Sequence, residues 1–287
     1  MVDDTAVAAD TDTDTTTTSK KMSGIETIAL FGATGKTGRY CLTQALGHGY
    51  KVRALVRDKS KLDASLFEVS NLTILQGDFS TDNKSSIEEC LSGADYVIVM
   101  AGCTPPNEGG SGGGGGGSYP QNMMLDFFKL LTMTIDKMIG TSRTNVKVLL
   151  YQAGAFSVTQ GQRLPIGMSI LKVVVGDWMM RSGQMVDDNN DVIRYVSENN
   201  HTWPFRVIVT RPAQIKDYGA LQKDTLVAER FTPPSPVVGA IGFYDLATFS
   251  LKALKDESLY GQYPYVVAKD RDLLAGHDNN VINDEGQ

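Results

Sequence analysis

The sequence predicts an α/β protein built on a doubly wound parallel sheet, and three observations carry that prediction. Short apolar runs typical of buried strands alternate along the chain with amphipathic stretches typical of helices. The first apolar run leads directly into a glycine-rich turn, Gly32-x-x-Gly35-x-x-Gly38, and then into a helical pattern. With 287 residues, the chain is long enough to bury a full α/β core.

The composition and the charge exclude several classes of function. A net charge of −6 gives no basic surface, so neither nucleic acid nor an anionic membrane is expected as a partner. Cys41, Cys90 and Cys103 are widely spaced and form no CxxC pair, which argues against a metal site or a disulfide framework and favours a reducing compartment. Residues 1–23 are rich in Asp and Thr and lack a targeting pattern. We therefore expect a disordered tail on a cytoplasmic protein.

The glycine turn predicts a phosphate-binding corner. The run Ile28–Phe31 reads as a buried strand, and the first amides of the helix after the turn lack partners at the positive end of the helix dipole. Gly32 permits a sharp exit from the strand, Gly35 lets a pyrophosphate approach the backbone, and Gly38 lets the helix pack closely. A glycine turn without a ligand is the alternative. The polar residues expected at this corner are Thr34, Lys36 and Thr37.

The second strand, Lys51–Val56, follows a helix that ends at His48-Gly49. It finishes at Arg57, where a nucleotide-binding fold places the group that meets the adenosine ribose. A cation there favours the 2′-phosphate of NADP, so Arg57, helped by Lys61, favours NADP(H) over NAD(H). Asp58 could instead serve the 2′-hydroxyl of NAD, and an exposed charged loop is a further alternative.

The third and fourth strands, Asn71–Gln76 and Asp95–Met100, are expected to end beside the same crevice. Asp78 could accept a hydrogen bond from the adenine amino group while Phe79 packs on the ring, although Asp78 could equally cap the next turn. A short helix over Ile87–Leu91 separates the two strands. The small residues after the fourth strand would let the nicotinamide ribose lie against backbone; they are Ala101 and Gly102.

The remainder of the chain continues the alternation and then loses it. The glycine-rich insertion Pro105–Pro120 is expected to be a mobile loop, either a tolerated surface expansion or a lid. Three prolines, Pro233, Pro234 and Pro236, indicate a loop over the substrate side. The other predicted elements are helices at Asn122–Ile139, Val186–Val196 and Asp245–Leu254, and strands at Val146–Tyr151, Phe205–Thr210 and Tyr263–Val267.

Several motifs resemble the atypical short-chain dehydrogenase/reductase family that includes NmrA-like and biliverdin-reductase-B-like proteins. The resemblance implies a single Rossmann-type NAD(P)-binding domain over residues 24–268, with a small C-terminal substrate region and a second tail at 269–287. The glycine turn is the most specific of these motifs. The motifs that carry the resemblance are Gly32–Gly38, Val56-Arg57, Gly77-Asp78, Val209-Thr210-Arg211-Pro212 and Ile241–Ala247.

The sequence departs from that family at the catalytic position. Catalytic members of the wider superfamily use Tyr-x-x-x-Lys, in which the lysine helps the tyrosine to donate a proton. That spacing occurs here only at Tyr265 to Lys269, in the final predicted strand and far from the expected place. Tyr151, Gln152 and Ser157 are weak candidates for contacting a substrate, and packing is the favoured role for Tyr151.

Two functions remain open at this point. The first is an NADPH-dependent oxidoreductase that transfers hydride to a flat small-molecule acceptor such as a flavin or quinone, because such an acceptor can take its proton from water. The second is a non-catalytic NADP(H)-binding sensor or scaffold that signals redox state to a protein partner. The missing Tyr-Lys pair favours the second function, and the intact glycine turn is compatible with both.

Overall fold

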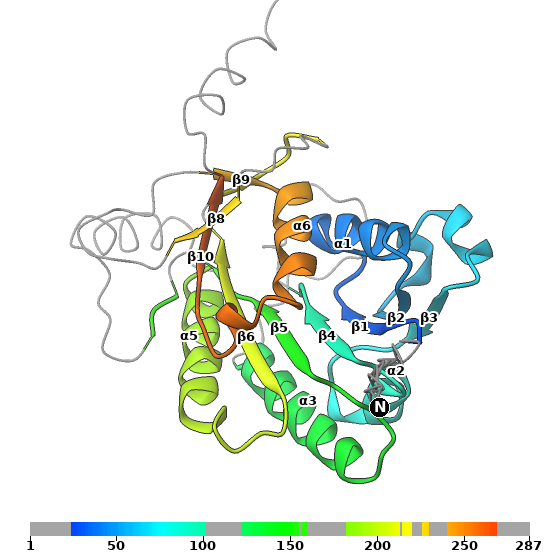
Figure 1. Ribbon diagram of the computed structural model, residues 1–287, viewed down its shortest axis with the longest axis horizontal. Coiled ribbons are helices and arrows are strands. Elements are labelled where there is room, and N and C mark those ends of the chain that lie inside the picture. The colour runs from blue at the N-terminus through cyan, green and yellow to red at the C-terminus, as the bar shows by residue number, and fades with distance from the viewer. Residues whose placement is uncertain are drawn as a thin grey trace, which may run out of the picture.

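A central sheet of eight strands runs through the molecule in the order β3-β2-β1-β4-β5-β6-β10-β8 (Figure 1). The computed structural model describes residues 24–101, 122–154, 157–159, 182–212, 214–219, 226–229 and 240–268. Every neighbouring pair of strands is parallel except β10 and β8, which are antiparallel. The predicted doubly wound parallel sheet is therefore confirmed, with one antiparallel strand added at its edge.

The strands and helices have the following bounds. The strands of the large sheet are β1 Thr27–Phe31, β2 Lys51–Val56, β3 Leu72–Gln76, β4 Tyr96–Val99, β5 Val148–Gln152, β6 Arg206–Pro212, β8 Leu226–Glu229 and β10 Tyr265–Ala268. A separate pair of parallel strands is formed by β7 Gln214–Lys216 and β9 Ala240–Gly242. The α-helices are α1 Lys36–Gly47, α2 Lys84–Leu91, α3 Met123–Gly140, α5 Ser182–Asn199 and α6 Phe243–Ala253. Short 3-10 turns are η1 Lys59–Lys61, η2 Ala64–Glu68, η3 Thr81–Asn83 and η4 Glu257–Leu259.

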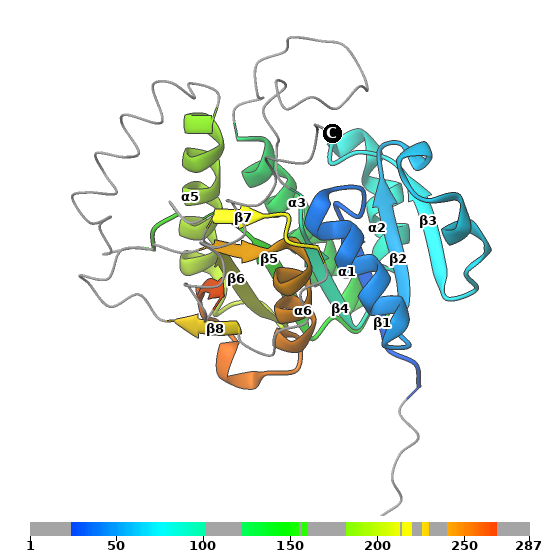
Figure 2. The same cartoon turned by 90° about the horizontal axis from the view of Figure 1, so that it is seen from above.

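The sheet is buried on both faces because its strands are apolar at successive positions. In β1, Ile28 and Leu30 pack into one hydrophobic core, whereas Ala29 and Phe31 pack into the other. This follows from the two-residue period of a strand, which turns neighbouring side chains to opposite faces. Helices α1 and α6 cover the first face, and α2, α3 and α5 cover the second (Figures 1 and 2).

The helices and strands that the sequence predicts are present, with small shifts at their ends. Strand β2 has the predicted bounds, and α1 ends before His48 and Gly49 as expected. Strand β5 begins and ends later than predicted, and β6 continues through Arg211 and Pro212 instead of stopping before them. Helix α6 begins at Phe243, ahead of the predicted start.

The expected loss of the regular strand–helix alternation after β6 agrees with the described part of the chain, where three short strands precede α6. Strands β7, β8 and β9 lie in that part of the chain. Each has only three or four residues, which is too short to show the two-residue period in the sequence. The predicted tails at 1–23 and 269–287, the glycine-rich insertion and the proline loop at 233–236 lie outside the described residues.

The strand order places a crevice at the carboxyl edge of the sheet. The chain leaves β1 toward β2 on one side and later returns to β4 on the other side of β1. In open α/β sheets a ligand crevice forms where the connections diverge in this way. The backbone amide of Met100, just after β4, donates to the carbonyl oxygen of Phe31 at 2.9 Å, which fixes the two strand ends side by side. Among the described residues, no helix is both apolar enough and long enough for a bilayer crossing.

Asp245 makes the stability of the folded protein depend on pH. It lies in the first turn of α6, is only 9 % exposed, and burial raises its pKa from 3.8 to about 6. Above that pKa the folded protein must bury a carboxylate, a cost that the neutral amide of Asp245→Asn avoids. We expect this variant to raise the free energy of unfolding by about 2 kcal/mol near neutral pH.

The sign of the effect follows from the raised pKa. As the pH falls through about 6 toward about 4, the folded wild-type protein takes up a proton that the unfolded chain does not yet bind, so its relative stability rises. The advantage of Asp245→Asn over wild type should therefore shrink across that window. Urea unfolding of both proteins at several pH values measures the difference, and an advantage that stays constant with pH would contradict the assignment.

Candidate dinucleotide site

The glycine turn between β1 and α1 has the close backbone approaches that the sequence predicts. Gly32 has a φ of +91°, and a Cβ atom there would lie 2.7 Å from the amide nitrogen of Ala101. A Cβ atom at Gly38 would lie 2.0 Å from the carbonyl oxygen of Gly32. The amide of Gly35 donates to that same oxygen at 3.0 Å, which closes the turn. Glycine is therefore required at Gly32 and Gly38 by space, and at Gly32 also by conformation.

The N-cap residue of α1 borders the crevice. Gly35 is the N-cap residue, has an extended conformation and is exposed. No acidic side chain stands in the first turn of α1. The positive end of the helix dipole is therefore not neutralised by that turn, which favours an anion beside the N-cap.

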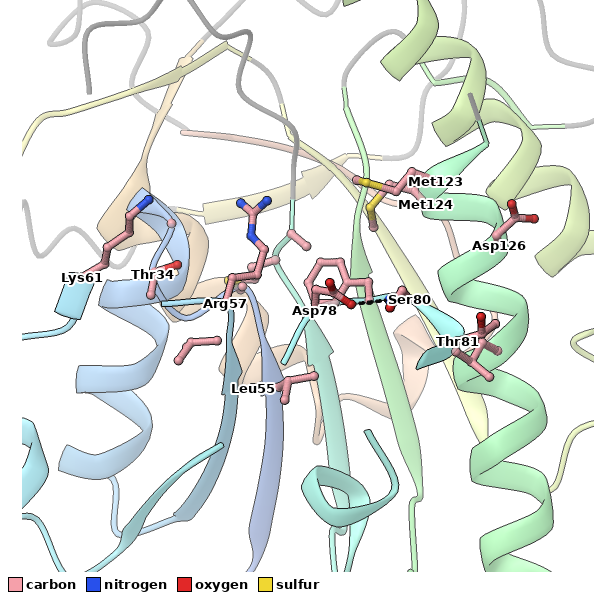
Figure 3. Close-up of a pocket in the computed structure, with 17 residues that line it drawn as sticks. Thr34, Leu55, Arg57, Lys61, Asp78, Ser80, Thr81, Met123, Met124 and Asp126 are labelled. Carbon is pink, nitrogen blue, oxygen red and sulfur yellow. Dashed lines mark hydrogen bonds between the residues drawn. The ribbon is translucent and has the colours of Figure 1, made fainter. Parts of the chain in front are cut away.

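A cavity of about 680 Å³ lies at the carboxyl edge of the sheet, beside the glycine turn (Figure 3). This volume lies in the range of small-molecule and cofactor sites. The cavity is bordered by the ends of β1, β2 and β4, the segment after β3, and the start of α3. Its lining residues are Gly32, Thr34, Gly35, Leu55, Val56, Arg57, Lys61, Asp78, Phe79, Ser80, Thr81, Met100, Ala101, Met123, Met124, Asp126 and Leu130.

Two cations border the cavity on the side of α1. Arg57 and Lys61 are both exposed, and Figure 3 shows them near Thr34. Asp58, which could have served a ribose hydroxyl, does not line the cavity. Its Oδ1 accepts hydrogen bonds from the amide and the hydroxyl of Ser60 at 3.0 and 2.7 Å, and these bonds lower its pKa. The carboxylate of Asp58 thus caps the η1 turn.

Asp78 lines the cavity and also supports its own turn. Its Oδ1 accepts from the amide of Ser80 at 2.8 Å and from the side-chain amide of Asn83 at 2.6 Å. Hydrogen bonds from Ser80, more than any other contact, hold the pKa of Asp78 below its ordinary value. Asp78 thus supports the local turn through Ser80, although Ser80 itself is the N-cap residue of η3, and its carboxylate also lies at the cavity wall.

Phe79 joins the cavity wall to the hydrophobic core. Its ring is stacked on Phe127 of α3 with the centroids 4.2 Å apart, and it meets Phe31 edge-on at 6.3 Å. Stacked and edge-on aromatic contacts of this kind hold rings in fixed orientations. A flat apolar surface is thus presented to the cavity by a rigid part of the fold.

Some of the predicted cofactor residues lie next to the cavity lining and not in it. The ammonium of Lys36 lies 5.5 Å from the ring centroid of Phe243, and Thr37 is buried. Gly38 packs against the turn itself. Ala101 lines the cavity, whereas Gly102 lies outside the described residues. Contact of these residues with a nucleotide stays a prediction.

The candidates for substrate contact after β5 lie outside the cavity lining. Tyr151 is fully buried, its hydroxyl donates to the side-chain oxygen of Asn189, and its ring meets Phe128 edge-on at 5.3 Å. The structure thus gives Tyr151 the packing role that the sequence favoured. Gln152 differs, because its side-chain oxygen is buried and has no hydrogen-bond partner among the described residues. Such an orphaned acceptor at a strand end is a candidate ligand contact.

Ser157 is fixed in the interior by groups from two strands. Its carbonyl oxygen accepts from Nη1 of Arg211 and from the hydroxyl of Tyr265, both at 3.3 Å. The guanidinium of Arg211 also donates from Nε to the carbonyl oxygen of Tyr263 at 2.9 Å and lies over the ring of Tyr265. Ser157 is 1 % exposed, so its hydroxyl is not presented to solvent in this conformation.

Sequence reasoning missed the contribution of α3, and of Ser80 and Thr81 in the segment after β3. Met123, Met124, Asp126 and Leu130 form the wall opposite the glycine turn, with Ser80 and Thr81 beside them (Figure 3). The position of α3 in the chain could have indicated this contribution, since a helix that follows a parallel strand begins at the carboxyl edge of the sheet. The apolar pattern of α3 instead indicated core residues, and most of its apolar residues do pack in the core.

Residues 25–110 match the NmrA-like family. An anaerobillin reductase from Escherichia coli O157:H7 has a similar structure, with a TM-score of 0.59 and 14 % sequence identity over 85 % of this chain and 98 % of that chain. A short-chain dehydrogenase/reductase from Veillonella parvula DSM 2008, solved in complex with NADP, gives a TM-score of 0.55 at 12 % identity over 86 % of this chain and 96 % of that chain. A candidate NADH-flavin reductase from Streptococcus pneumoniae TIGR4 gives a TM-score of 0.56 at 16 % identity, over 86 % of this chain and 100 % of that chain.

These similarities agree with the motifs. The family match covers the glycine turn, Arg57 and Asp78, which are the residues that carried the resemblance in the first half of the chain. The structural matches cover most of this chain and nearly all of each relative, and at such low identity they show a common fold. The chain therefore carries an NmrA-like segment on the fold of the short-chain dehydrogenases/reductases, as its motifs predicted.

Proposed function

We propose that the protein is an NAD(P)H-dependent oxidoreductase whose dinucleotide lies across the carboxyl edge of the sheet. The observation that carries this proposal is the glycine turn, where Gly35, the exposed N-cap residue of α1, lines a cavity that Arg57 and Lys61 also border. A pyrophosphate fits that corner because bare backbone and a positive helix end meet there. The NADP-bound and reductase-type relatives support the class of cofactor and of chemistry.

The second part of the proposal is a preference for NADP(H). Arg57 and Lys61 are exposed cations on the same side of the cavity, and the nearby carboxylate of Asp58 is engaged by Ser60. Two cations on one side of the cavity suit a 2′-phosphate better than a 2′-hydroxyl. Phe79 and Asp78, which follow the neighbouring strand β3, suit the face and the edge of an adenine ring.

The residues around the cavity would act by orienting the dinucleotide and the acceptor and by excluding water from them. The bound nicotinamide supplies the hydride. The glycine turn would hold the diphosphate, and the aromatic wall at Phe79 would fix the adenine end. The orphaned side-chain oxygen of Gln152 would accept a hydrogen bond from a ligand N–H or O–H. A flat acceptor such as a flavin, quinone or related ring fits this arrangement, because its proton can come from water.

A non-catalytic NADP(H) sensor of NmrA-like type is the second candidate. It is favoured by the family match at residues 25–110 and by the placement of Tyr151, whose hydroxyl is bound within the core. Such a protein would pass the redox state of the nucleotide to a protein partner. Both functions would use the same cavity, and we propose a cytoplasmic location for either.

Side-by-side titration with NADPH and NADH, followed by turnover assays, tests the proposal. We expect nucleotide fluorescence to report tighter binding of NADPH than of NADH, by about ten-fold or more. With a panel of flavins and quinones, we expect consumption of NADPH above the rate without protein. Binding without turnover of any acceptor would favour the sensor, and the absence of binding to both nucleotides would remove both functions.

A further inference from the structure

Arg39 connects the two segments that border the cavity on the α1 side. Its Nε donates to the carbonyl oxygen of Thr34 at 3.1 Å, and its Nη2 donates to the carbonyl oxygen of Lys61 at 2.9 Å. Thr34 belongs to the glycine turn and Lys61 ends the η1 turn after β2, and both residues line the cavity. A single planar guanidinium thus holds together two walls that come from different parts of the chain.

The η1 turn depends on this contact because it is very short. A single 3-10 turn leaves its last carbonyl groups without partners of its own, and a cation is well suited to satisfy them. The other end of the turn is capped by Asp58, and Leu62 just after it is buried in the core. Arg39 therefore holds the η1 turn against the glycine turn.

We propose that Arg39 is a positioning residue that determines nucleotide specificity: by bridging Thr34 and Lys61, it sets the place at which Lys61 and Arg57 meet a 2′-phosphate. This inference rests on the proposed function and refines it. The bridge requires the fork of a guanidinium, since two donors point in fixed directions from one plane. A lysine would keep the charge but could not hold both carbonyl groups in the same geometry.

The test compares Arg39→Met and Arg39→Lys with wild-type protein by titration with NADPH and with NADH. We expect each variant to lose about ten-fold in affinity for NADPH and about two-fold or less for NADH, so that the preference between the nucleotides falls. Arg53→Met is the matched control. Arg53 also donates from its guanidinium to a backbone carbonyl, that of Glu89, but does not line the cavity.

The outcomes separate this inference from the proposed function. A preference that is retained in Arg39→Lys would show that charge alone suffices and would overturn the positioning role. Equal losses for the two nucleotides in Arg39→Met would overturn the role in specificity. In both cases wild-type protein would still bind NADPH, so the proposed function would stand, whereas failure of wild-type protein to bind either nucleotide would remove both. Thermal melting of each variant shows that the fold is kept.

Discussion

Gly38→Ala is expected to abolish nucleotide binding and to lower the free energy of unfolding by about 3 kcal/mol. The added Cβ would lie 2.0 Å from the carbonyl oxygen of Gly32 and 2.8 Å from its carbonyl carbon. Both are backbone atoms of a tight turn, so no side chain can move aside to relieve the clash. The helix would have to shift away from the turn, and the amides at its start would leave the cavity. Urea unfolding and titration with NADPH measure the two effects.

Gly47→Ala is the matched control for this substitution. Gly47 belongs to the same helix, and a Cβ atom there would meet nothing within 4 Å. Alanine has the higher helix propensity, so this variant should be as stable as wild type or more stable by about 0.5 kcal/mol. If the two variants lost stability to the same extent, the clash at Gly38 would not be the cause.

Arg57→Glu is expected to lower the affinity for NADPH by about 100-fold while leaving the affinity for NADH little changed. The substitution replaces a cation at the cavity wall with a carboxylate that would face a 2′-phosphate. The same carboxylate can accept a hydrogen bond from a 2′-hydroxyl, so NADH has a compensating contact. Equilibrium titration with both nucleotides gives the ratio.

Lys51→Glu controls for the change in overall charge. Lys51 is exposed at the opposite end of the same strand, and its replacement alters the net charge by the same amount. Its effect on either nucleotide should be small, because charges that are remote and exposed to solvent are screened by salt. If Lys51→Glu lowered NADPH affinity as much as Arg57→Glu, a long-range field would replace the local contact as the explanation.

The first third of the fold was predictable because its signals are local. Gly32 fixes the turn by space and conformation and Gly38 by space, and the apolar runs on either side of the turn and its helix indicate buried strands. Arg57 could be placed at the cavity for the same reason, since a residue just after a parallel strand lies at the carboxyl edge of the sheet.

The rest of the site depends on contacts that local sequence does not encode. Asp126 reaches the cavity only because α3 packs across the sheet, and Arg39 bridges two turns whose proximity appears only in the folded chain. Asp78 is a third case. Its sequence position suits both a ligand contact and a turn cap, and in the structure it accepts hydrogen bonds from Ser80 and Asn83, whereas Ser80 is the N-cap residue. The short strands β7 to β9 carried too few residues to reveal a period.

The division of alternate strand residues between two cores constrains how this chain can vary in length. If one residue were inserted within β1 or β4, every later side chain of that strand would exchange faces, and both cores would be disrupted together. An addition beyond a strand leaves its alternation unchanged, and in the sequence the glycine-rich tract at 105–120 comes after the end of β4. Diversification of such a protein is thereby directed to the rim of the sheet, next to its ligand crevice.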